Sequence, residues 1–284
     1  LDLASLRGLV RFQLENGSHG ISVGGSTGEP SSQSPAERVA AMRTVSEEIG
    51  DRVPFMPGTG SAKLDETLEL TGAAEDAGAD AVLVITPYYS RPTQEALYRW
   101  YSTVAGEFPA MPIVIYNVPS RTAVDIDPPT VARLRRDNDN IIGIKETTKD
   151  FEHFSWVLRR CGRDFLMWSG IELLGLPLLA LGGAGFVSAA ANIAPRAVAA
   201  MYEHWMAGEH EQALEIHFDL HPLVEMLFVE TNPAPVKWAL EHFGLLSSGC
   251  VRPPLIALTP EGRKSVLALL DDAKRLVSSG LLTS

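Results

Sequence analysis

The stretch IIGIK at residues 141–145 is an almost uninterrupted apolar run that ends on a lysine. Such a run, in which apolar and polar residues do not alternate, is typical of a parallel strand buried on both faces. Similar short runs recur along the chain at intervals of about 20 to 30 residues, at 21–25, 54–58, 81–87, 112–118, 165–169 and 185–189. The sequence therefore predicts seven strands of a parallel sheet.

Stretches of helical periodicity separate these runs. Residues 34–49, for example, open with the capping pair Ser34-Pro35 and stop at Gly50. Alternation of strand and helix predicts either a doubly wound open sheet or a (β/α)8 barrel. The open sheet would need a glycine-rich nucleotide loop, but the GTG at 58–60 lacks a third glycine and no GxxxxGK[ST] occurs. The barrel is favoured, with its site at the C-terminal ends of the strands.

The expected domain organisation follows from where the strands stop. Residues 195–277 read as helix, which is more than one barrel unit needs. We expect residues 1–195 to form strands 2–8 of the barrel, and residues 196–284 to form its final helix and an appended C-terminal helical bundle. Since a barrel of this type has eight strands and the chain opens on a helical stretch at 2–16, we expect the first strand to be missing from the printed sequence.

Composition narrows the class of protein and its partners. The chain has 284 residues, a net charge of −11 and 45% hydrophobic residues, and no Lys/Arg cluster, so neither nucleic acid nor an anionic membrane is an expected partner. The uncharged stretch 173–195 contains Pro177 and several glycines, which favours a buried helix followed by a strand over a membrane span. Cys161 and Cys250 form no CxxC pair, which indicates reduced thiols and a cytoplasmic location.

Polar residues at strand ends are the candidates for chemistry. Lys145 alone among the six lysines terminates a buried run, so its amine could be a neutral nucleophile for a Schiff base, or it could be a structural lysine paired with Glu146 or another carboxylate. Tyr116 ends another run, where its hydroxyl could relay protons or anchor a loop. Arg121 lies in the following PSRT segment, where it could bind a carboxylate or be solvated.

Two further loops carry hydroxyl or phenol groups after predicted strands. The hydroxyls of Ser26 and Thr27 lie among glycines after the first run, as an anion-binding nest or a tight turn. Tyr89, in a YYSRP segment after another run, could be part of a lid, a subunit contact or a catalytic group.

His217 and His221 lie four apart on a helix, but far from the strand ends and without HExxH, so no metal is expected.

Together these strand-end segments resemble the dihydrodipicolinate synthase / N-acetylneuraminate lyase family. The matching segments occur in the order of the family and span most of the chain: GGSTGEP at 24–30, TPYYSRPTQEALY at 86–98, YNVPSRT at 116–122, GIKETT at 143–148, WSG at 168–170, GFVSAAAN at 185–192 and NPAPVKWA at 232–239. The resemblance implies a (β/α)8 barrel that forms a Schiff base with pyruvate or another 2-oxo acid, without a metal or organic cofactor.

The resemblance also implies catalytic roles for four residues. Lys145 would form the Schiff base, and Tyr116 would act as general acid/base. Ser26 and Tyr89 would complete a proton relay, with Tyr89 reaching in from a neighbouring subunit. A homo-oligomer, either a dimer or a tetramer, is therefore expected.

Substrate-binding roles are implied for the remaining residues. Ser26 and Thr27 would hold the pyruvate carboxylate, Arg121 would bind the carboxylate of a second substrate, and Gly170 and Val187 would line the pocket.

The second substrate is predicted from the segments around Arg121, Ser26 and residues 146–153. The PSRT segment with Arg121 favours the synthase type, in which the second substrate is aspartate semialdehyde. Ser26, where synthases more often carry threonine, and the divergent 146–153 segment leave open a retro-aldol lyase of aromatic catabolism. A dehydratase on a sugar-derived 2-oxo acid and a catalytically silent small-molecule binder also stay open. Pro35 and Ala62 stand where lysine-inhibited synthases carry histidine and asparagine, so we predict no inhibition by lysine.

Overall fold

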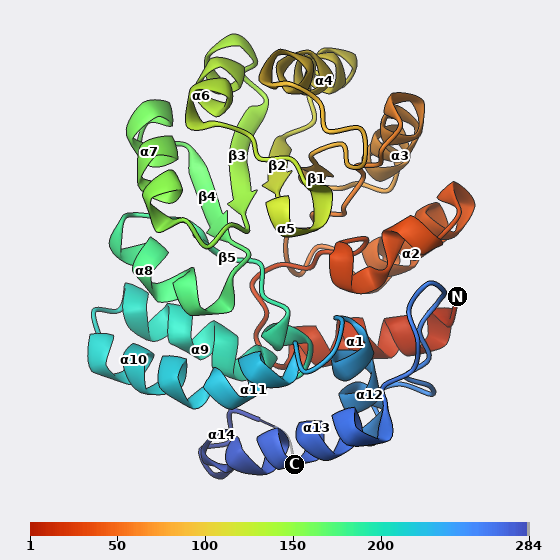
Figure 1. The fold of residues 1–284 in the computed structure, drawn as a ribbon, viewed down its shortest axis with the longest axis vertical. Helices are drawn as coiled ribbons and strands as arrows, with labels where there is room; N and C mark the ends of the chain where they lie inside the picture. The colour runs from red at the N-terminus through yellow and green to blue at the C-terminus, as the bar shows by residue number, and fades with distance from the viewer. Residues whose placement is uncertain (283–284) are drawn as a thin grey trace.

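A computed structural model describes residues 1–282, and its centre is a parallel sheet (Figure 1). Five strands follow one another in chain order: β1 (Val82–Ile85), β2 (Ile113–Asn117), β3 (Ile141–Glu146), β4 (Leu166–Ser169) and β5 (Gly185–Phe186). Every neighbouring pair is parallel. The strand prediction is confirmed for these five runs.

The two N-terminal runs are shorter than predicted, because they pair only through isolated parallel bridges. Ile21 bridges Phe55, and Gly58 bridges Leu83 of β1, which extends the sheet by two segments. Prolines at 54 and 57 supply no backbone N–H, so they cannot donate to a continuous ladder. The predicted run 185–189 likewise shortens to the two residues of β5.

Within residues 1–282, no backbone pairing joins the segment at Ile21 to β5. A cavity of about 940 Å³ lies along these two edges, with Ile21, Phe186 and Trp168 among its lining residues. The expected strand ahead of residue 1 stays a prediction.

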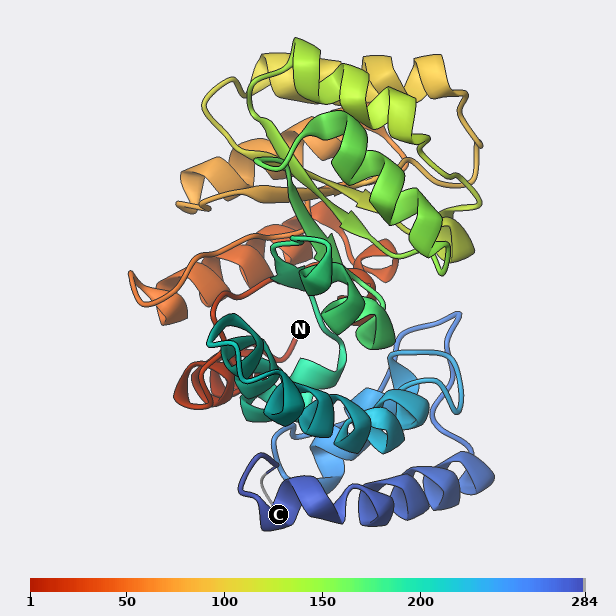
Figure 2. The same cartoon turned by 90° about the vertical axis from the view of Figure 1, so that its left-hand side faces the viewer.

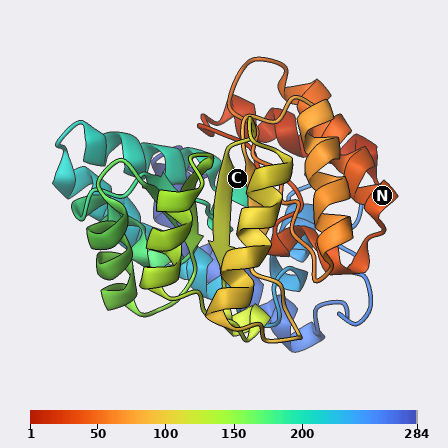
Figure 3. The ribbon, with the colours of Figure 1, turned by 90° about the horizontal axis from the view of Figure 1, so that it is seen from above.

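Except for the short α5, which directly follows β2, the helices of the first two thirds lie side by side around the strands, as Figure 3 shows from above. They are α1 (Leu3–Glu15), α2 (Pro35–Ile49), α3 (Leu64–Asp76), α4 (Gln94–Glu107), α5 (Pro119–Thr122), α6 (Pro128–Asp137), α7 (Phe151–Cys161) and α8 (Gly175–Ala180). The predicted start of α2 is confirmed: Ser34 and Glu37 form a reciprocal capping box, an arrangement that contributes about 1 kcal/mol.

The C-terminal helices gather on one side of the barrel (Figure 2). They are α9 (Pro195–Met206), α10 (His210–Asp219), α11 (His221–Met226), α12 (Ala234–His242), α13 (Pro260–Asp272) and α14 (Lys274–Ser278). They share an apolar core with Leu176 and Leu179 of α8, separate from the core under α1–α7. The predicted division at residue 195 stays a prediction. No helix of the described chain is long and apolar enough to cross a membrane.

Candidate active site

Tyr116 and Lys145 lie side by side where β2 and β3 end. The parallel register pairs Tyr116 with Lys145, so their side chains share one face of the sheet. Lys145 Nζ lies 4.3 Å from the centroid of the Tyr116 ring. Both residues are buried: Lys145 is 9% exposed and Tyr116 is 5% exposed. The two strand ends therefore place an amine and a phenol in contact inside the barrel.

The phenol of Tyr116 also contacts the loop that carries Ser26. Its hydroxyl lies 3.2 Å from Ser26 Oγ, within hydrogen-bond distance. Burial alone would raise the pKa of Tyr116, but the charge of Lys145, the hydrogen bond with Ser26 and the charge of Arg121 outweigh burial and lower it. The structure thus joins three of the predicted site residues, Lys145, Tyr116 and Ser26, in one continuous line.

The loop that carries Ser26 and Thr27 needs glycine at two points. Gly24 has a φ of +75°, and a Cβ on Gly58 would lie 2.5 Å from the Gly24 carbonyl oxygen, so the two backbones approach too closely for side chains. This approach sets the short helix η1 (Ser26–Gly28) at the barrel mouth. Thr27 Oγ1 accepts a hydrogen bond from Asn232 Nδ2 at 3.0 Å.

Arg121 belongs to α5, directly after β2, and is exposed. Its Nη2 donates to the backbone carbonyl of Asn232 at 3.3 Å. Together with Ser26 and Tyr116 it lines a cavity of about 210 Å³. Asn232, which is 6% exposed, thus contacts both Thr27 and Arg121 from the C-terminal part of the chain. Sequence reasoning noted the NPAPVKWA motif but assigned no role to this residue.

Gly170 and Val187 lie on the other side of Lys145. Gly170 follows β4, and a Cβ there would lie 2.8 Å from Lys145 Cε and 2.0 Å from Thr147 Oγ1. The Val187 backbone N–H donates to Ser169 at 2.9 Å, and its side chain lines the larger cavity. Gly170 therefore packs against the lysine, whereas Val187 lines a different cavity from Ser26 and Arg121.

Within the single chain, Tyr89 does not contact Lys145, Tyr116 or Ser26 in the described residues. It is 93% exposed and has a φ of +73°, whereas its neighbour Tyr88 lines the 210 Å³ cavity. The ring of Tyr89 therefore projects away from the chain that carries it.

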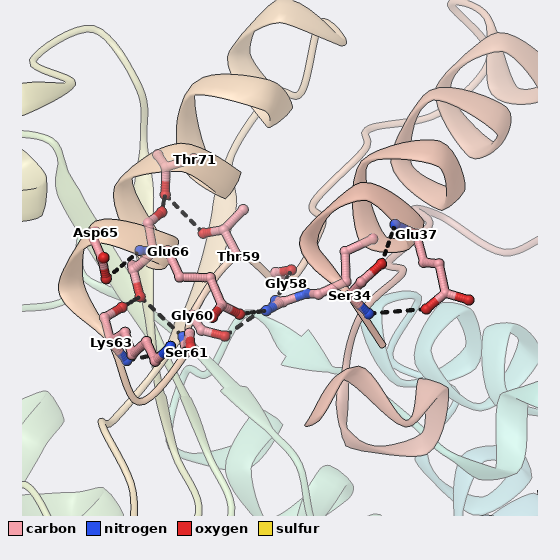
Figure 4. Close-up of polar contacts among 12 residues, drawn as sticks. Ser34, Glu37, Gly58, Thr59, Gly60, Ser61, Lys63, Asp65, Glu66 and Thr71 are labelled. Atoms are coloured by element: carbon pink, nitrogen blue, oxygen red, sulfur yellow. Dashed lines mark hydrogen bonds and ion pairs between the residues drawn. The ribbon is translucent and has the colours of Figure 1, made fainter. Parts of the chain in front are cut away.

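The 210 Å³ cavity is also lined by a buried cation that was not predicted from the sequence, Arg38. Arg38, on α2, is 3% exposed and donates to the carbonyls of Gly58 and Gly60 at 3.0 and 3.1 Å. It lies 3.6 Å from the Glu66 carboxylate. Burial lowers the pKa of Arg38, with the Glu66 charge acting against that shift. Figure 4 shows Glu66 beside the Gly58 and Gly60 backbone, with the capped start of α2 next to them. The sequence carries no signal for Arg38 beyond its place in a helix.

Glu146 does not pair with Lys145, because successive residues of a strand point to opposite faces. Its carboxylate is fully buried and lies 3.2 Å from His153 Nε2 of α7. The alternative in which Lys145 is a structural partner of Glu146 is therefore wrong. Neither His153 nor this contact was singled out from the sequence.

The two histidines considered for a metal make a different contact. His221 Nδ1 lies 3.0 Å from the His217 carbonyl oxygen. Within residues 1–282 no group of three or more His, Cys, Asp or Glu side chains is arranged to hold a metal ion.

These features define a parallel (β/α) barrel with a lysine-centred site at the C-terminal ends of its strands. The chain belongs to the dihydrodipicolinate synthetase family, whose model matches residues 1–273.

Individual members of this family match the chain over most of its length and most of their own. The 4-hydroxy-tetrahydrodipicolinate synthase of Thermus thermophilus is 48% identical over 261 residues, covering 92% of this chain and 87% of that protein. The enzyme of the same name from Methanopyrus kandleri is 43% identical and covers 98% and 90%. Among solved structures, the 4-hydroxy-tetrahydrodipicolinate synthase of Methylacidiphilum fumariolicum SolV superposes with a TM-score of 0.95 at 38% identity, covering 100% of this chain and 94% of that one.

Proposed function

We propose that this chain is a lyase of the Schiff-base type that condenses pyruvate with aspartate semialdehyde, the reaction of a 4-hydroxy-tetrahydrodipicolinate synthase. The observation that carries the proposal is the line from Lys145 Nζ to the Tyr116 ring at 4.3 Å and from the Tyr116 hydroxyl to Ser26 Oγ at 3.2 Å. The relatives named as this enzyme, up to 48% identical, support the choice of substrates.

The proposed reaction begins on Lys145. Its neutral amine attacks the carbonyl carbon of pyruvate, and loss of water leaves an iminium. The iminium takes up the electron pair released when a methyl proton leaves, which gives an enamine. The enamine carbon forms a bond to the aldehyde carbon of the second substrate, whose oxygen takes a proton. The amine of aspartate semialdehyde then attacks the iminium carbon, closes the ring and frees Lys145.

Tyr116 is the proposed acid/base in these transfers. A phenol with a lowered pKa gives up its proton more readily near neutral pH than an ordinary tyrosine, and Ser26 provides the next hydroxyl along the relay. Tyr89 would complete the relay from a neighbouring subunit, which fits its 93% exposure in the single chain. We therefore propose a homo-oligomer, a dimer or a tetramer. We also propose a cytoplasmic location, on the two free cysteines.

The remaining residues are proposed to hold the two carboxylates and shape the pocket. Because Asn232 donates to Thr27 Oγ1, the hydroxyl hydrogen of Thr27 is left to donate elsewhere, and we assign it with Ser26 to the pyruvate carboxylate. Arg121, exposed at the mouth of the cavity, is proposed to bind the carboxylate of the second substrate. Gly170 is proposed to line the pocket beside Lys145, and Val187 to bound it from the side of the larger cavity.

Borohydride reduction in the presence of pyruvate tests the mechanism. Peptide mapping by mass spectrometry should find a pyruvate-sized adduct on Lys145, and K145R, which cannot form an imine, should show none. An adduct elsewhere with Lys145 unmodified would overturn the proposed mechanism. Rates with aspartate semialdehyde and with a panel of neutral and aromatic aldehydes then test the second substrate. A faster rate with another aldehyde would favour the retro-aldol lyase instead.

A further inference from the structure

The face of β2 and β3 opposite the candidate site carries a second pair of neighbours. The register that sets Tyr116 beside Lys145 also sets Asn117 beside Glu146. Asn117 Nδ2 donates to Glu146 Oε1 at 2.9 Å, which ties the two strand ends together one residue beyond the reactive pair. Glu146 is also joined directly to Lys145 by one peptide unit of β3.

The carboxylate of Glu146 is held by several hydrogen-bond donors on one side and contacts His153 on the other. Oε1 also accepts from the backbone N–H groups of Thr147 and Thr148 at 3.0 and 3.2 Å. Oε2 lies 3.2 Å from His153 Nε2. His153 is itself 8% exposed. No Lys or Arg in residues 1–282 forms an ion pair with Glu146.

The charges around this pair favour a protonated His153. Burial raises the pKa of Glu146, and His153 and Asn117 act against that shift. Burial by itself would lower the pKa of His153, but the carboxylates of Glu146, Asp125 and Asp150 outweigh burial and raise it. Asp125 follows α5, and Asp150 caps α7, so negative charges face His153 from both neighbouring elements as well as from β3.

We propose that His153 is a positioning residue: in its protonated form it neutralises the buried Glu146 carboxylate and so fixes the strand ends that carry Tyr116 and Lys145. This inference rests on the proposed function, because it assigns His153 to the formation of the Schiff base on Lys145. A buried carboxylate without a counter-charge must take up a proton or move toward water. Movement toward water weakens the link to Asn117 and displaces Lys145, whereas protonation leaves an oxygen that can still accept from Asn117.

The test uses H153Q, the double variant E146Q/H153Q, and H210Q as a control at an exposed histidine of α10. Borohydride trapping of pyruvate on Lys145 is measured as a rate, together with melting temperature. At neutral pH we expect H153Q to trap at least about tenfold more slowly than wild type, in the range that small misplacements of reacting groups produce. In E146Q/H153Q the buried charge is gone while the amide oxygen still accepts from Asn117, so trapping should recover to within about threefold of wild type. H210Q should match wild type.

A pH profile separates positioning from a structural role. The ratio of wild-type to H153Q trapping rates should be largest where Glu146 is ionised and His153 is protonated. It should fall on the alkaline side, as the pH rises through the raised pKa of His153, and on the acid side, as Glu146 takes up its proton. A ratio near one at every pH, or a lowered melting temperature in H153Q with no change in trapping rate, would overturn the inference.

The proposed function can fail independently. If wild type traps pyruvate on Lys145 but does not turn over aspartate semialdehyde, the second substrate is wrong and the trapping ratios still test His153. If wild type forms no adduct on Lys145, the proposed mechanism fails and the His153 inference fails with it.

Discussion

Replacing Gly170 with alanine adds a single methyl group next to Lys145. The new Cβ would lie 2.8 Å from Lys145 Cε and 2.0 Å from Thr147 Oγ1, the second about 1.4 Å short of the 3.4 Å at which ordinary contact begins. The backbone around Gly170 cannot retreat freely, because its N–H donates to the Glu146 carbonyl at 2.7 Å. The side chains of Lys145 and Thr147 must therefore move.

The overlap should affect both the folding free energy and kcat. Overpacking of a well-filled site costs about 1–3 kcal/mol of folding free energy, so G170A should still fold. Displacement of a reacting group by about 1 Å costs about 100-fold in rate, so kcat should fall by at least that factor. The loss should appear in kcat and in the rate of borohydride trapping more than in the melting temperature.

The assay compares G170A with a double variant and with a control glycine. G170A/T147A removes the hydroxyl overlap but keeps the contact with Lys145 Cε, so stability should return while kcat stays low. Gly8, on α1, has nothing within 4 Å of its ideal Cβ, and G8A should keep wild-type kcat while gaining about 0.5–1 kcal/mol of stability. Wild-type kcat in a folded G170A would refute the packing of Gly170 against the nucleophile.

Three other outcomes can be checked with simple measurements. R121A should lower kcat/KM for aspartate semialdehyde by about 10- to 100-fold, the worth of hydrogen bonds to a charged group, with little effect on KM for pyruvate; an unchanged value would favour a neutral second substrate. L-lysine should not inhibit turnover, since Pro35 and Ala62 replace the expected polar residues, and sub-millimolar inhibition would contradict this. The hydrogen bond from Arg252, with one from the Ser34 N–H, lowers the pKa of Glu37 from 4.5 to about 2, so their stabilising effect is complete above pH 4.5 and lost as the pH falls toward 2. The difference in melting temperature between wild type and E37Q should therefore close over that range; a constant difference would contradict the assignment.

The parts of the site that could be predicted are those fixed by strand geometry. A lysine or tyrosine that ends a continuous apolar run is expected to lie at the C-terminal mouth of the barrel. The strand register confirms that Tyr116 and Lys145 are neighbours there. Strand extents were less predictable at the N-terminal runs and at 185–189. Proline and the close approach of Gly24 and Gly58 accompany the reduction of the two N-terminal runs to isolated bridges, and the third run shortens to the two residues of β5.

Residues that support the site from outside the strand ends could not be found in this way. Arg38 and His153 lie on helices, where a charged residue is ordinarily solvated, and only the packing of α2 and α7 shows that both are buried. Asn232 reaches Thr27 across 205 positions of sequence. The contacts of Arg38 and Asn232 depend on the placement of whole elements, which the local sequence pattern does not determine.

The pairing of Lys145 with Glu146 could have been excluded from the sequence. The two residues are adjacent in a strand, and the period of two sends adjacent side chains to opposite faces, so the pairing was ruled out once the strand was predicted. The same rule requires a buried Glu146 to find another partner on the helix side, among residues that follow β3. His153, two positions inside α7, is the histidine that lies there, and it forms the contact with Glu146. The alternation of side chains along a predicted strand thus indicates two things. It shows which face of the sheet carries the nucleophile Lys145, and that a partner for the next residue, Glu146, must lie on the opposite face.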